Sequence, residues 1–485
     1  MARSVRLSGV VSEMTRRRRI LVLLICCMSL LIVSLDNTIV NVALPSLGHD
    51  LRAPVSGLQW TVDAYTLTLA SLLMLAGSTA DRMGRRRTFQ IGLVVFTAGS
   101  LLCSLAPSLG WLVAARILQA IGGSMLNPVA MSIITNTFTD RRERAQAIGV
   151  WGGVVGVSMA LGPVVGGLLT DTVNWRAIFW INVPIGLLAL FLTWRFVPES
   201  KAPSARRTDP VGQVLVIVLL GTLTYGIIEG PAAGAAVSAA CFAVAAAALA
   251  ALVVWELRRP QPLIDMRFFR SAPFSGAAVM AVSGFGGLGA FLFLNTLYLQ
   301  SHRGLSALAA GLCTLPVALI TVIVGPLSGR LVGTRGPRLP SVVAGVCLAV
   351  AGALMSQVTL TTPLPLLLGI YAVFGVGFAM LNPPITNTAV SGMPLAQAGV
   401  AAAVASTSRQ VGQSLGVAIA GSVVSGAGAG AAFVPAAHAA YRVNALYGLI
   451  VLAVALLTTG RWARATAERT AARLVESPQV TLSRG

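Results

Sequence analysis

The chain contains 485 residues, of which 56% are hydrophobic and only 10% are charged. This composition excludes an ordinary soluble domain and is typical of a helical protein that crosses a membrane many times. The formal net charge of +20 would suit a nucleic-acid partner, but the basic residues form short clusters between long apolar segments, so we expect no nucleic acid to bind.

Fourteen apolar segments are long enough to cross the hydrocarbon core of a bilayer, which takes about 20 residues of α-helix. Their approximate bounds are 20–43, 58–80, 88–109, 111–136, 147–170, 176–197, 210–228, 232–255, 273–299, 307–331, 339–357, 364–390, 400–427 and 442–460. The sequence therefore predicts an all-α, polytopic membrane protein with 14 transmembrane helices.

The distribution of lysine and arginine supports this count, because the cytoplasmic connections of membrane proteins are enriched in both. If the N-terminus is cytoplasmic, the connections on the outer side hold only four of the 35 basic residues, which are Arg52, Arg176, Arg303 and Arg442. We therefore expect a multi-pass membrane protein with both termini in the cytoplasm.

The first apolar segment contains an acidic residue, Asp36, close to its C-terminal end. A charged side chain in the hydrocarbon core costs about 3 kcal/mol or more, so it usually faces the interior of a helix bundle or a wet cavity. Desolvation also favours the neutral form of a carboxyl group, which suits a proton carrier. A structural role, with Asp36 hydrogen-bonded to a neighbouring helix, is the alternative.

The second and fourth apolar segments each add a charged residue, Asp63 and Arg116. Because successive helices alternate in direction, these two residues and Asp36 are expected at one level in the outer leaflet. An arginine stabilises the charge of a nearby carboxylate, whereas two close carboxylates favour protonation of one of them. This combination suits the exchange of a proton for a cationic or polar substrate. For Asp63, an interfacial position close to water is the alternative.

A short connection, residues 77–87, joins the second and third apolar segments and reads Gly-Ser-Thr-Ala-Asp-Arg-Met-Gly-Arg-Arg-Arg. Glycine permits a tight turn, and the carboxylate of Asp81 can accept hydrogen bonds from arginines. The loop resembles the signature of the major facilitator superfamily, a glycine followed by Asp-Arg-x-Gly-Arg-Arg. This resemblance implies a cytoplasmic gating loop made by Gly77, Asp81, Arg82, Gly84, Arg85 and Arg86. Ordinary positive charge on the cytoplasmic side is the alternative.

The fifth apolar segment contains Gly-Pro-Val-Val-Gly-Gly at residues 162–167, where small residues let helices approach and a proline permits a kink. The string is similar to the antiporter signature of the same superfamily. It implies an antiporter helix with Gly162, Pro163, Gly166 and Gly167 as its characteristic residues. Together with Ser-Arg-Gln-Val-Gly-Gln-Ser-Leu-Gly at residues 408–416, it makes the chain resemble the fourteen-helix drug:proton antiporter family over residues 20–460.

An internal repeat indicates two related halves, because Met-Leu-Asn-Pro at residues 125–128 returns at residues 380–383. Parallel repeats with a substrate path between them are a known transporter architecture. The parts that we expect are a cytoplasmic N-terminal tail (1–19), a six-helix bundle (20–200), two additional transmembrane helices (210–255), a second six-helix bundle (272–460) and a disordered cytoplasmic tail (461–485).

The family resemblance implies a drug:proton antiporter in a bacterial cytoplasmic membrane, which exports hydrophobic, often cationic, drugs or antibiotics by alternating access. Asp36, Arg116 and Asp63 are then expected to couple transport to protons. The residues expected to line the substrate cavity are Asp63, Trp60, Tyr65, Asn37, Asn41, Gln119, Asn127, Asn382, Arg409, Gln410 and Gln413. The alternatives are export of a single endogenous metabolite or antibiotic and, behind it, nutrient:proton symport.

Other classes of protein fit the sequence poorly. The only lysine, Lys201, follows no glycine-rich phosphate loop, so an ATP-driven pump is not expected. The three histidines are far apart and show no metal-ligand or nucleophile–base spacing, so we expect neither an enzyme nor a metal site. Protons are the expected coupling ion, no cofactor is expected, membrane lipid is the expected surrounding, and a monomer is the expected functional form.

The C-terminal half is distinguished by the acidic residues that it lacks, because none lies between Asp265 and Glu468. A carboxylate that carries protons is therefore expected in the N-terminal half or at Glu229. The apolar segment 400–427 carries Arg409 instead. The residues on the same helical stripe as Arg409 are Ser406, Gln410 and Gln413. Whether this stripe lines the cavity or joins helices stays open.

Overall fold

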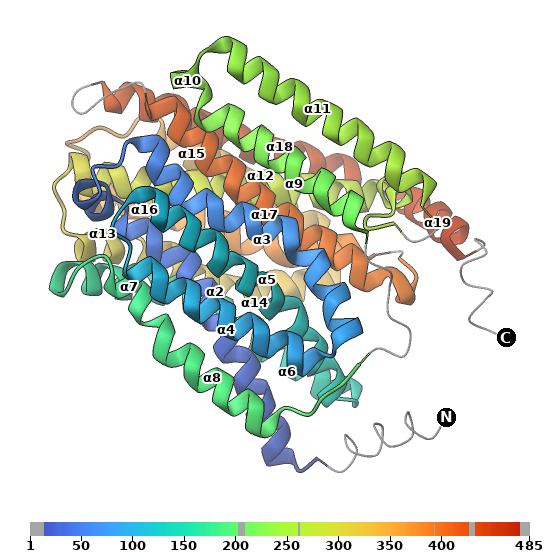
Figure 1. Ribbon diagram of the computed structural model, residues 1–485. Coiled ribbons are helices and arrows are strands. Elements are labelled where there is room, and N and C mark those ends of the chain that lie inside the picture. The colour runs from blue at the N-terminus through green and yellow to red at the C-terminus, as the bar shows by residue number, and fades with distance from the viewer. Residues whose placement is uncertain (1–13, 202–208, 260–261, 392, 426–431, 476–485) are drawn as a thin grey trace. The chain divides into compact units, whose positions relative to one another are not determined.

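The computed structural model describes residues 14–201, 209–259, 262–391, 393–425 and 432–475. All regular elements within these ranges are helices (Figure 1). The first group of helices is α2 (Arg16–Asp50), α3 (Val55–Met83), α4 (Arg85–Ser104), α5 (Leu109–Thr137), α6 (Arg141–Thr172), α7 (Ala177–Trp180) and α8 (Asn182–Phe196). The middle group is α9 (Pro210–Ile228), α10 (Gly230–Ala233) and α11 (Ala235–Arg258).

The remaining helices include a short 3-10 helix and a π-helix that continues α12. They are η1 (Met266–Arg270), α12 (Ala272–Thr296), η2 (Leu297–His302), α13 (Ala307–Cys313), α14 (Leu315–Arg335), α15 (Arg338–Met355), α16 (Leu364–Val390), α17 (Leu395–Ser425), α18 (Phe433–Thr458) and α19 (Arg461–Val475). Every apolar segment predicted to span the membrane overlaps one of the long helices.

Thirteen described helical segments are long and apolar enough to cross a membrane. The fourteenth predicted segment, 400–427, corresponds to α17, which has 31 residues but carries Arg409 and three glutamines within its length. These polar side chains lower the hydropathy of α17, although at about 1.5 Å per residue it is long enough to cross a bilayer. The predicted all-α membrane fold is confirmed.

Two boundaries differ from the sequence-based expectation. The first apolar segment was expected to end near residue 43, but α2 continues through Pro45 to Asp50 because Leu44 and Leu47 still pack into the interior. The tail 461–485 was expected to be disordered, and this is wrong for α19. The side chains that α19 buries recur at helical spacing and are those of Ala463, Ala467, Thr470 and Leu474.

The chain divides into two compact units, which are described separately. Unit 1 comprises Met1–Ala53, Trp60–Thr208 and Ser306–Leu312, and unit 2 comprises Pro54–Gln59, Asp209–Leu305 and Cys313–Gly485. In unit 1, α2 packs against α5, α6 and α8, and α4 packs against α5 and α8. The largest buried side chains of this core include Arg116, Tyr65, Phe89, Phe96 and Phe179.

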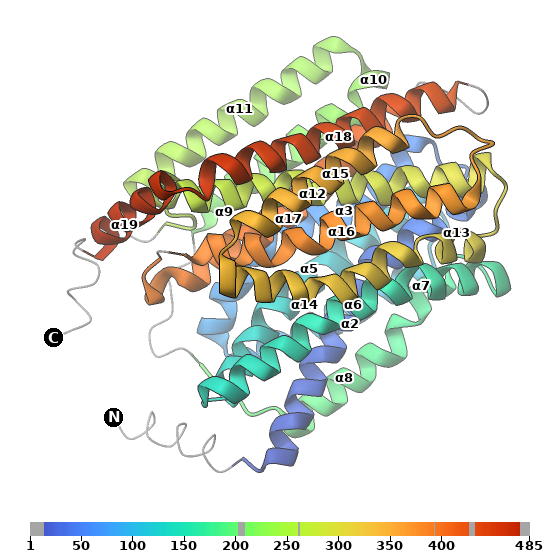
Figure 2. The same cartoon turned by 180° about the vertical axis from the view of Figure 1, so that it is seen from behind.

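In unit 2, α12 packs against α16, α17 and α18, and α15 packs against α16 and α18. Figure 2 shows α15 and α18 side by side. The hairpin of α9 and α11 belongs to this unit, and α9 also contacts α17. At the start of α9, the Asp209 carboxylate accepts hydrogen bonds from the Gly212 amide (2.9 Å) and from Trp255 Nε1 of α11 (3.0 Å). One side chain therefore caps α9 and joins the two helices.

Candidate functional site

A buried ion pair joins two helices of unit 1. The Arg116 guanidinium of α5 donates from Nη1 to the Asp36 carboxylate of α2, and these residues are 1% and 0% exposed. Arg116 also donates from Nε to the carbonyl oxygen of Thr61 in α3 (3.1 Å), and its Cζ lies 4.1 Å from the centre of the Tyr65 ring. Three helices therefore converge on one pair of charges, and the pairing offsets the large desolvation penalty of each.

Two amide side chains complete the hydrogen bonding of Asp36. Gln119 Nε2 donates to Asp36 Oδ1 over 2.8 Å, and Asn182 Nδ2 donates to the same oxygen over 3.1 Å. Gln119 Oε1 in turn accepts a hydrogen bond from Arg116 Nη1 (2.8 Å). The four side chains form a closed polar network, so protonation of Asp36 would weaken its bonds to three partners at once.

Asn182 and its support were missed by the sequence-based reasoning. Asn182 is the first residue of α8 and is fully buried, and its Nδ2 also donates to Ser100 Oγ of α4 (3.1 Å). Ser100 Oγ donates to the carbonyl oxygen of Phe179 (2.9 Å). The available signal was a polar amide inside the apolar segment 176–197, because a side chain of this kind needs a partner when it is buried.

Asp63 lies on the same helix as two contacts of Arg116 but on another side of it. The side chain is fully buried, and its Oδ1 accepts a hydrogen bond from Thr66 Oγ1 at 3.5 Å. Thr61 and Tyr65, which contact Arg116, are each two residues from Asp63, about 200° around the helix axis. The structure thus brings Asp36 and Arg116 into contact and places Asp63 beside this network rather than between its members.

The predicted cavity residues are distributed over both units. Those of unit 1 are Asn37, Asn41, Trp60, Asp63, Tyr65, Gln119 and Asn127, and those of unit 2 are Asn382, Arg409, Gln410 and Gln413. Among them Asn41, Tyr65, Gln119 and Gln413 are buried. Asn41 Nδ2 donates to the backbone carbonyl of Asn37, one turn earlier in α2 (3.1 Å). Asp63 is buried as well, and the remaining predicted cavity residues are at least partly accessible.

The internal repeat occupies equivalent positions in α5 and α16. Asn127 lies as far from the first residue of α5 as Asn382 lies from the first residue of α16. By the same register, Tyr371 of α16 corresponds to Arg116. The buried Tyr371 hydroxyl donates to Asn295 Oδ1 of α12. Unit 2 therefore has a neutral hydrogen bond where unit 1 has an ion pair.

The predicted gating loop forms the junction of α3 and α4. Gly84 has a φ of +108°, which favours glycine, and Asp81 forms an ion pair with Arg85 at 3.5 Å. The carboxylate of Glu199, which the sequence analysis missed, accepts hydrogen bonds from the backbone amides of Arg86 (3.1 Å) and Arg87 (3.3 Å). Glu199 thus caps the N-terminus of α4, where a negative charge is favourable.

The other members of this loop surround the same junction. Arg86 Nη2 donates to the carbonyl oxygen of Trp194 in α8 (2.7 Å). Arg82 is exposed at the end of α3, and a Cβ atom at Gly77 would meet no atom within 4 Å. Close packing therefore does not require a glycine at position 77.

The glycines of the predicted antiporter helix allow α6 to approach α2 beside Asp36. A Cβ atom at Gly162 would lie 2.0 Å from Thr38 Oγ1, and one at Gly166 would lie 2.7 Å from Ile39 Cγ1. Gly167 faces α13, where a Cβ atom would lie 2.5 Å from Leu308 Cα. Pro163, between these glycines, is buried. Larger residues at these positions would push α6 away from the helix that carries Asp36.

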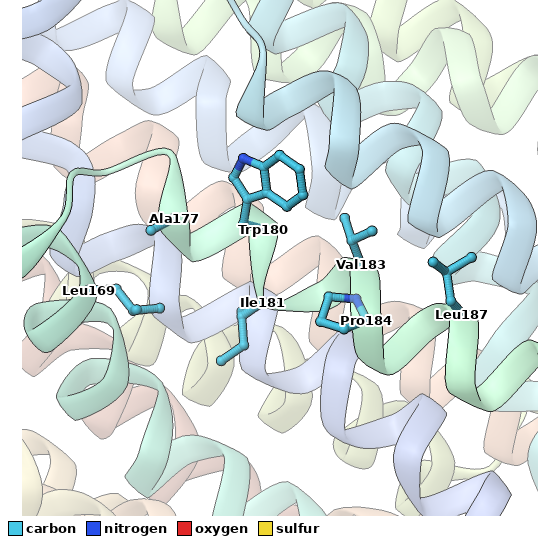
Figure 3. A pocket seen from close by; sticks show the side chains of 7 residues that line it. All are labelled: Leu169, Ala177, Trp180, Ile181, Val183, Pro184 and Leu187. Atoms are coloured by element: carbon cyan, nitrogen blue, oxygen red, sulfur yellow. The ribbon is translucent and has the colours of Figure 1, made fainter.

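An apolar pocket lies on α6, α7 and α8 of unit 1 (Figure 3). Its lining consists of Leu169, Ala177, Trp180, Ile181, Val183, Pro184 and Leu187. None of these side chains carries a charge, and Trp180 is half exposed. The pocket suits hydrocarbon and is distinct from the ion-pair network.

The long apolar helices are those of a multi-pass membrane protein. Residues 26–417 match the family model of the Major Facilitator Superfamily, and the chain belongs to this superfamily. The predicted family and the predicted transporter class, rather than an enzyme, are thereby confirmed.

Two relatives cover most of the chain. Multidrug resistance protein Stp of Mycobacterium tuberculosis (strain CDC 1551 / Oshkosh) is 38% identical, with 82% of this chain and 74% of the relative covered. The tetracenomycin C resistance and export protein of Streptomyces glaucescens is 35% identical, with 81% of this chain and 74% of the relative covered. Among solved structures, a POT family transporter in complex with 5-aminolevulinic acid is similar, with a TM-score of 0.68 and 15% identity over 90% of this chain and 96% of the other. This last likeness shows the fold.

Proposed function

We propose that the protein exports hydrophobic, often cationic, drugs or antibiotics across a bacterial cytoplasmic membrane in exchange for protons. Two observations of different kinds support this proposal. The relatives described above are named for multidrug resistance and for resistance to and export of one antibiotic. The observation that carries the proton-coupling step is the buried network of Asp36, Arg116, Gln119 and Asn182.

The network supplies a group that can take up and release a proton. When Asp36 is charged, Arg116 and two amides stabilise its carboxylate. A proton from the outer side neutralises Asp36 and leaves Arg116 as a buried cation with weaker partners, which destabilises the packing of α2 on α5. Release of the proton on the cytoplasmic side restores the ion pair. Alternating access then couples proton entry to export of the substrate.

A dedicated exporter of one endogenous metabolite or antibiotic is the second candidate. The relative named for tetracenomycin C resistance and export supports it. Nutrient:proton symport has less support, because the Gly-Pro-x-x-Gly-Gly string at residues 162–167 resembles the antiporter signature. Gly162 and Gly166 of this string also pack α6 on α2.

The topology and the assembly are part of this proposal. We place both termini in the cytoplasm, because the outer connections hold so few basic residues. We propose a functional monomer, because the network around Asp36 is complete within one chain. Membrane lipid is the expected neighbour of the apolar pocket, whose lining is wholly nonpolar.

Proton release from proteoliposomes, reported by a pH-sensitive dye after addition of ethidium, tests the proposed exchange. The wild-type protein is expected to move protons when ethidium is added, and Asp36→Asn is expected to abolish this movement. Glu143→Gln is the matched control, because it removes a carboxylate whose side chain is 41% exposed. Substrate-driven proton movement that persists in Asp36→Asn would shift the coupling to Asp63 or Glu229. Its absence from wild-type protein with every compound tried would contradict antiport.

A further inference from the structure

Arg409 of unit 2 is a cation within the long helix α17, and the hydrogen bonds of its guanidinium to described residues go to two hydroxyl groups. Its Nη2 donates to Thr386 Oγ1 of α16 (2.5 Å), and its Nη1 donates to Ser406 Oγ one turn earlier in α17 (3.4 Å). Its Nε is buried and has no hydrogen-bond partner within the part of the chain that the structure describes. Guanidinium has five N–H donors, so most of its capacity is left for a ligand.

The surrounding sequence provides no carboxylate to neutralise Arg409. No aspartate or glutamate occurs between Asp265 and Glu468, and Arg409 forms no ion pair among the described residues. Arg409 is partly exposed, and a charge that is partly removed from water without a counter-charge is unfavourable. In unit 1, by contrast, the arginine has a counter-charge: Arg116 is 1% exposed and forms an ion pair with Asp36.

The surroundings of Arg409 combine polar and aromatic groups that remain partly accessible. We call this set the Arg409 patch, and it consists of Arg409, Gln410, Thr386, Asn382 and Phe285. Asn382 and Thr386 are exposed one turn apart on α16, and Arg409, Gln410 and Phe285 are partly exposed. The Cζ atom of Arg409 lies 5.8 Å from the centre of the Phe285 ring. A ligand can therefore meet a cation and an aromatic surface at one place.

We propose that Arg409 binds an anionic group of the exported compound, a carboxylate or an ionised phenol on an aromatic molecule. Nε and Nη2 form the edge of guanidinium that suits a bidentate contact with two oxygens, and Nε carries no other hydrogen bond among the described residues. Phe285 packs against the aromatic part of the same molecule. This inference rests on the proposed export function and adds acidic and zwitterionic aromatic compounds to its substrates.

Two dyes that differ only in one ester test the proposal. Rhodamine 110 has a free carboxylate, and rhodamine 123 is its methyl ester. Binding of each dye to purified protein in detergent is measured by fluorescence anisotropy. Wild-type protein is expected to bind rhodamine 110 about ten-fold more tightly, and Arg409→Gln is expected to remove that preference without changing the affinity for rhodamine 123 more than about two-fold. Arg409→Lys keeps the charge but not the bidentate edge, so it should retain part of the preference.

Controls separate recognition from folding. Thr386→Val removes a hydroxyl that orients Arg409, and it should weaken the binding of rhodamine 110 less than Arg409→Gln does. The proposal would be overturned if Arg409→Gln lost affinity for both dyes equally, or if the wild-type protein did not bind rhodamine 110 more tightly than rhodamine 123. Displacement of rhodamine 110 by phosphatidylglycerol but not by benzoate would also overturn it, because the anion would then be a lipid headgroup. If Arg409→Gln fails to fold, the comparison of Arg409→Lys with wild type decides.

The proposed export function is tested independently of this site. Ethidium carries no carboxylate, so ethidium-driven proton release from the wild-type protein tests export without the anion contact. Such release, together with a preference for rhodamine 110 that Arg409→Gln removes, supports both proposals. Absence of ethidium-driven release from wild-type protein, with the dye preference intact, would contradict export of cations while leaving the anion site supported.

Discussion

Asp36→Asn should destabilise the protein because it leaves the Arg116 guanidinium buried without its carboxylate. Removal of one partner from a buried ion pair typically costs about 3–5 kcal/mol. Arg116 keeps the Gln119 side chain, the Thr61 carbonyl and the ring of Tyr65, and the new amide can still accept one hydrogen bond. We therefore expect a loss near the lower end of that range, about 3 kcal/mol in the free energy of unfolding.

The double variant Asp36→Asn/Arg116→Gln tests whether this loss arises from the uncompensated cation. Removing the guanidinium as well should recover about 2 kcal/mol, so that the double variant is more stable than Asp36→Asn alone. Tryptophan fluorescence during denaturant titration in detergent micelles gives the four free energies of the cycle. Losses that simply add in the double variant would refute the reasoning, because they would mean that the two side chains contribute independently.

Three further predictions concern the packing of α13 on α6, the cap of α4 and the C-terminal helix α19. Gly311→Ala should lower the free energy of unfolding by about 1–3 kcal/mol, because the new Cβ atom would lie 2.2 Å from a carbonyl oxygen of α6. Gly149→Ala is the control: its Cβ atom would meet no atom within 4 Å, so it should leave the thermal unfolding temperature unchanged or raise it. Glu199→Ala should lower the free energy of unfolding by about 1 kcal/mol, because α4 loses its N-terminal cap. Lys201→Ala, near the same junction, is the control and should change the unfolding temperature little. Truncation after Gly460 should lower the unfolding temperature in detergent, because α19 buries three apolar side chains. The Thr466 hydroxyl of α19 also accepts a hydrogen bond from the backbone amide of Ala272. An unchanged unfolding temperature would show that α19 does not stabilise unit 2.

The helices of this protein could be predicted because the signal for each of them is local. A long apolar run must satisfy its backbone hydrogen bonds within the membrane, and only a helix does so within one segment. The level of Asp36 and Arg116 also followed from counting residues along alternating helices. The course of α2 beyond Pro45 was not predictable in this way, because it depends on what Leu44 and Leu47 contact.

The partners of Asp36 and of α4 were harder to predict because they come from distant parts of the chain. Asn182 is 146 residues from Asp36, and Glu199 is 113 residues from Arg86. No periodicity or spacing in the sequence relates residues that meet only after the helices have packed. An amide inside an apolar segment could have indicated that Asn182 needs a partner, but the identity of that partner depends on how α8 packs against α2 and α4.

The register of the repeat indicates that the two units have diverged in their electrostatics. Arg116 with Asp36 occupies the position in unit 1 that the neutral pair Tyr371 and Asn295 occupies in unit 2. We therefore assign the proposed proton uptake to unit 1. Unit 2 instead carries Arg409, whose own segment supplies no carboxylate. A bound acidic substrate would provide in unit 2 the negative charge that Asp36 provides in unit 1. In the proposed cycle Arg116 is then paired whenever Asp36 is charged, and Arg409 is paired only while an acidic substrate is bound.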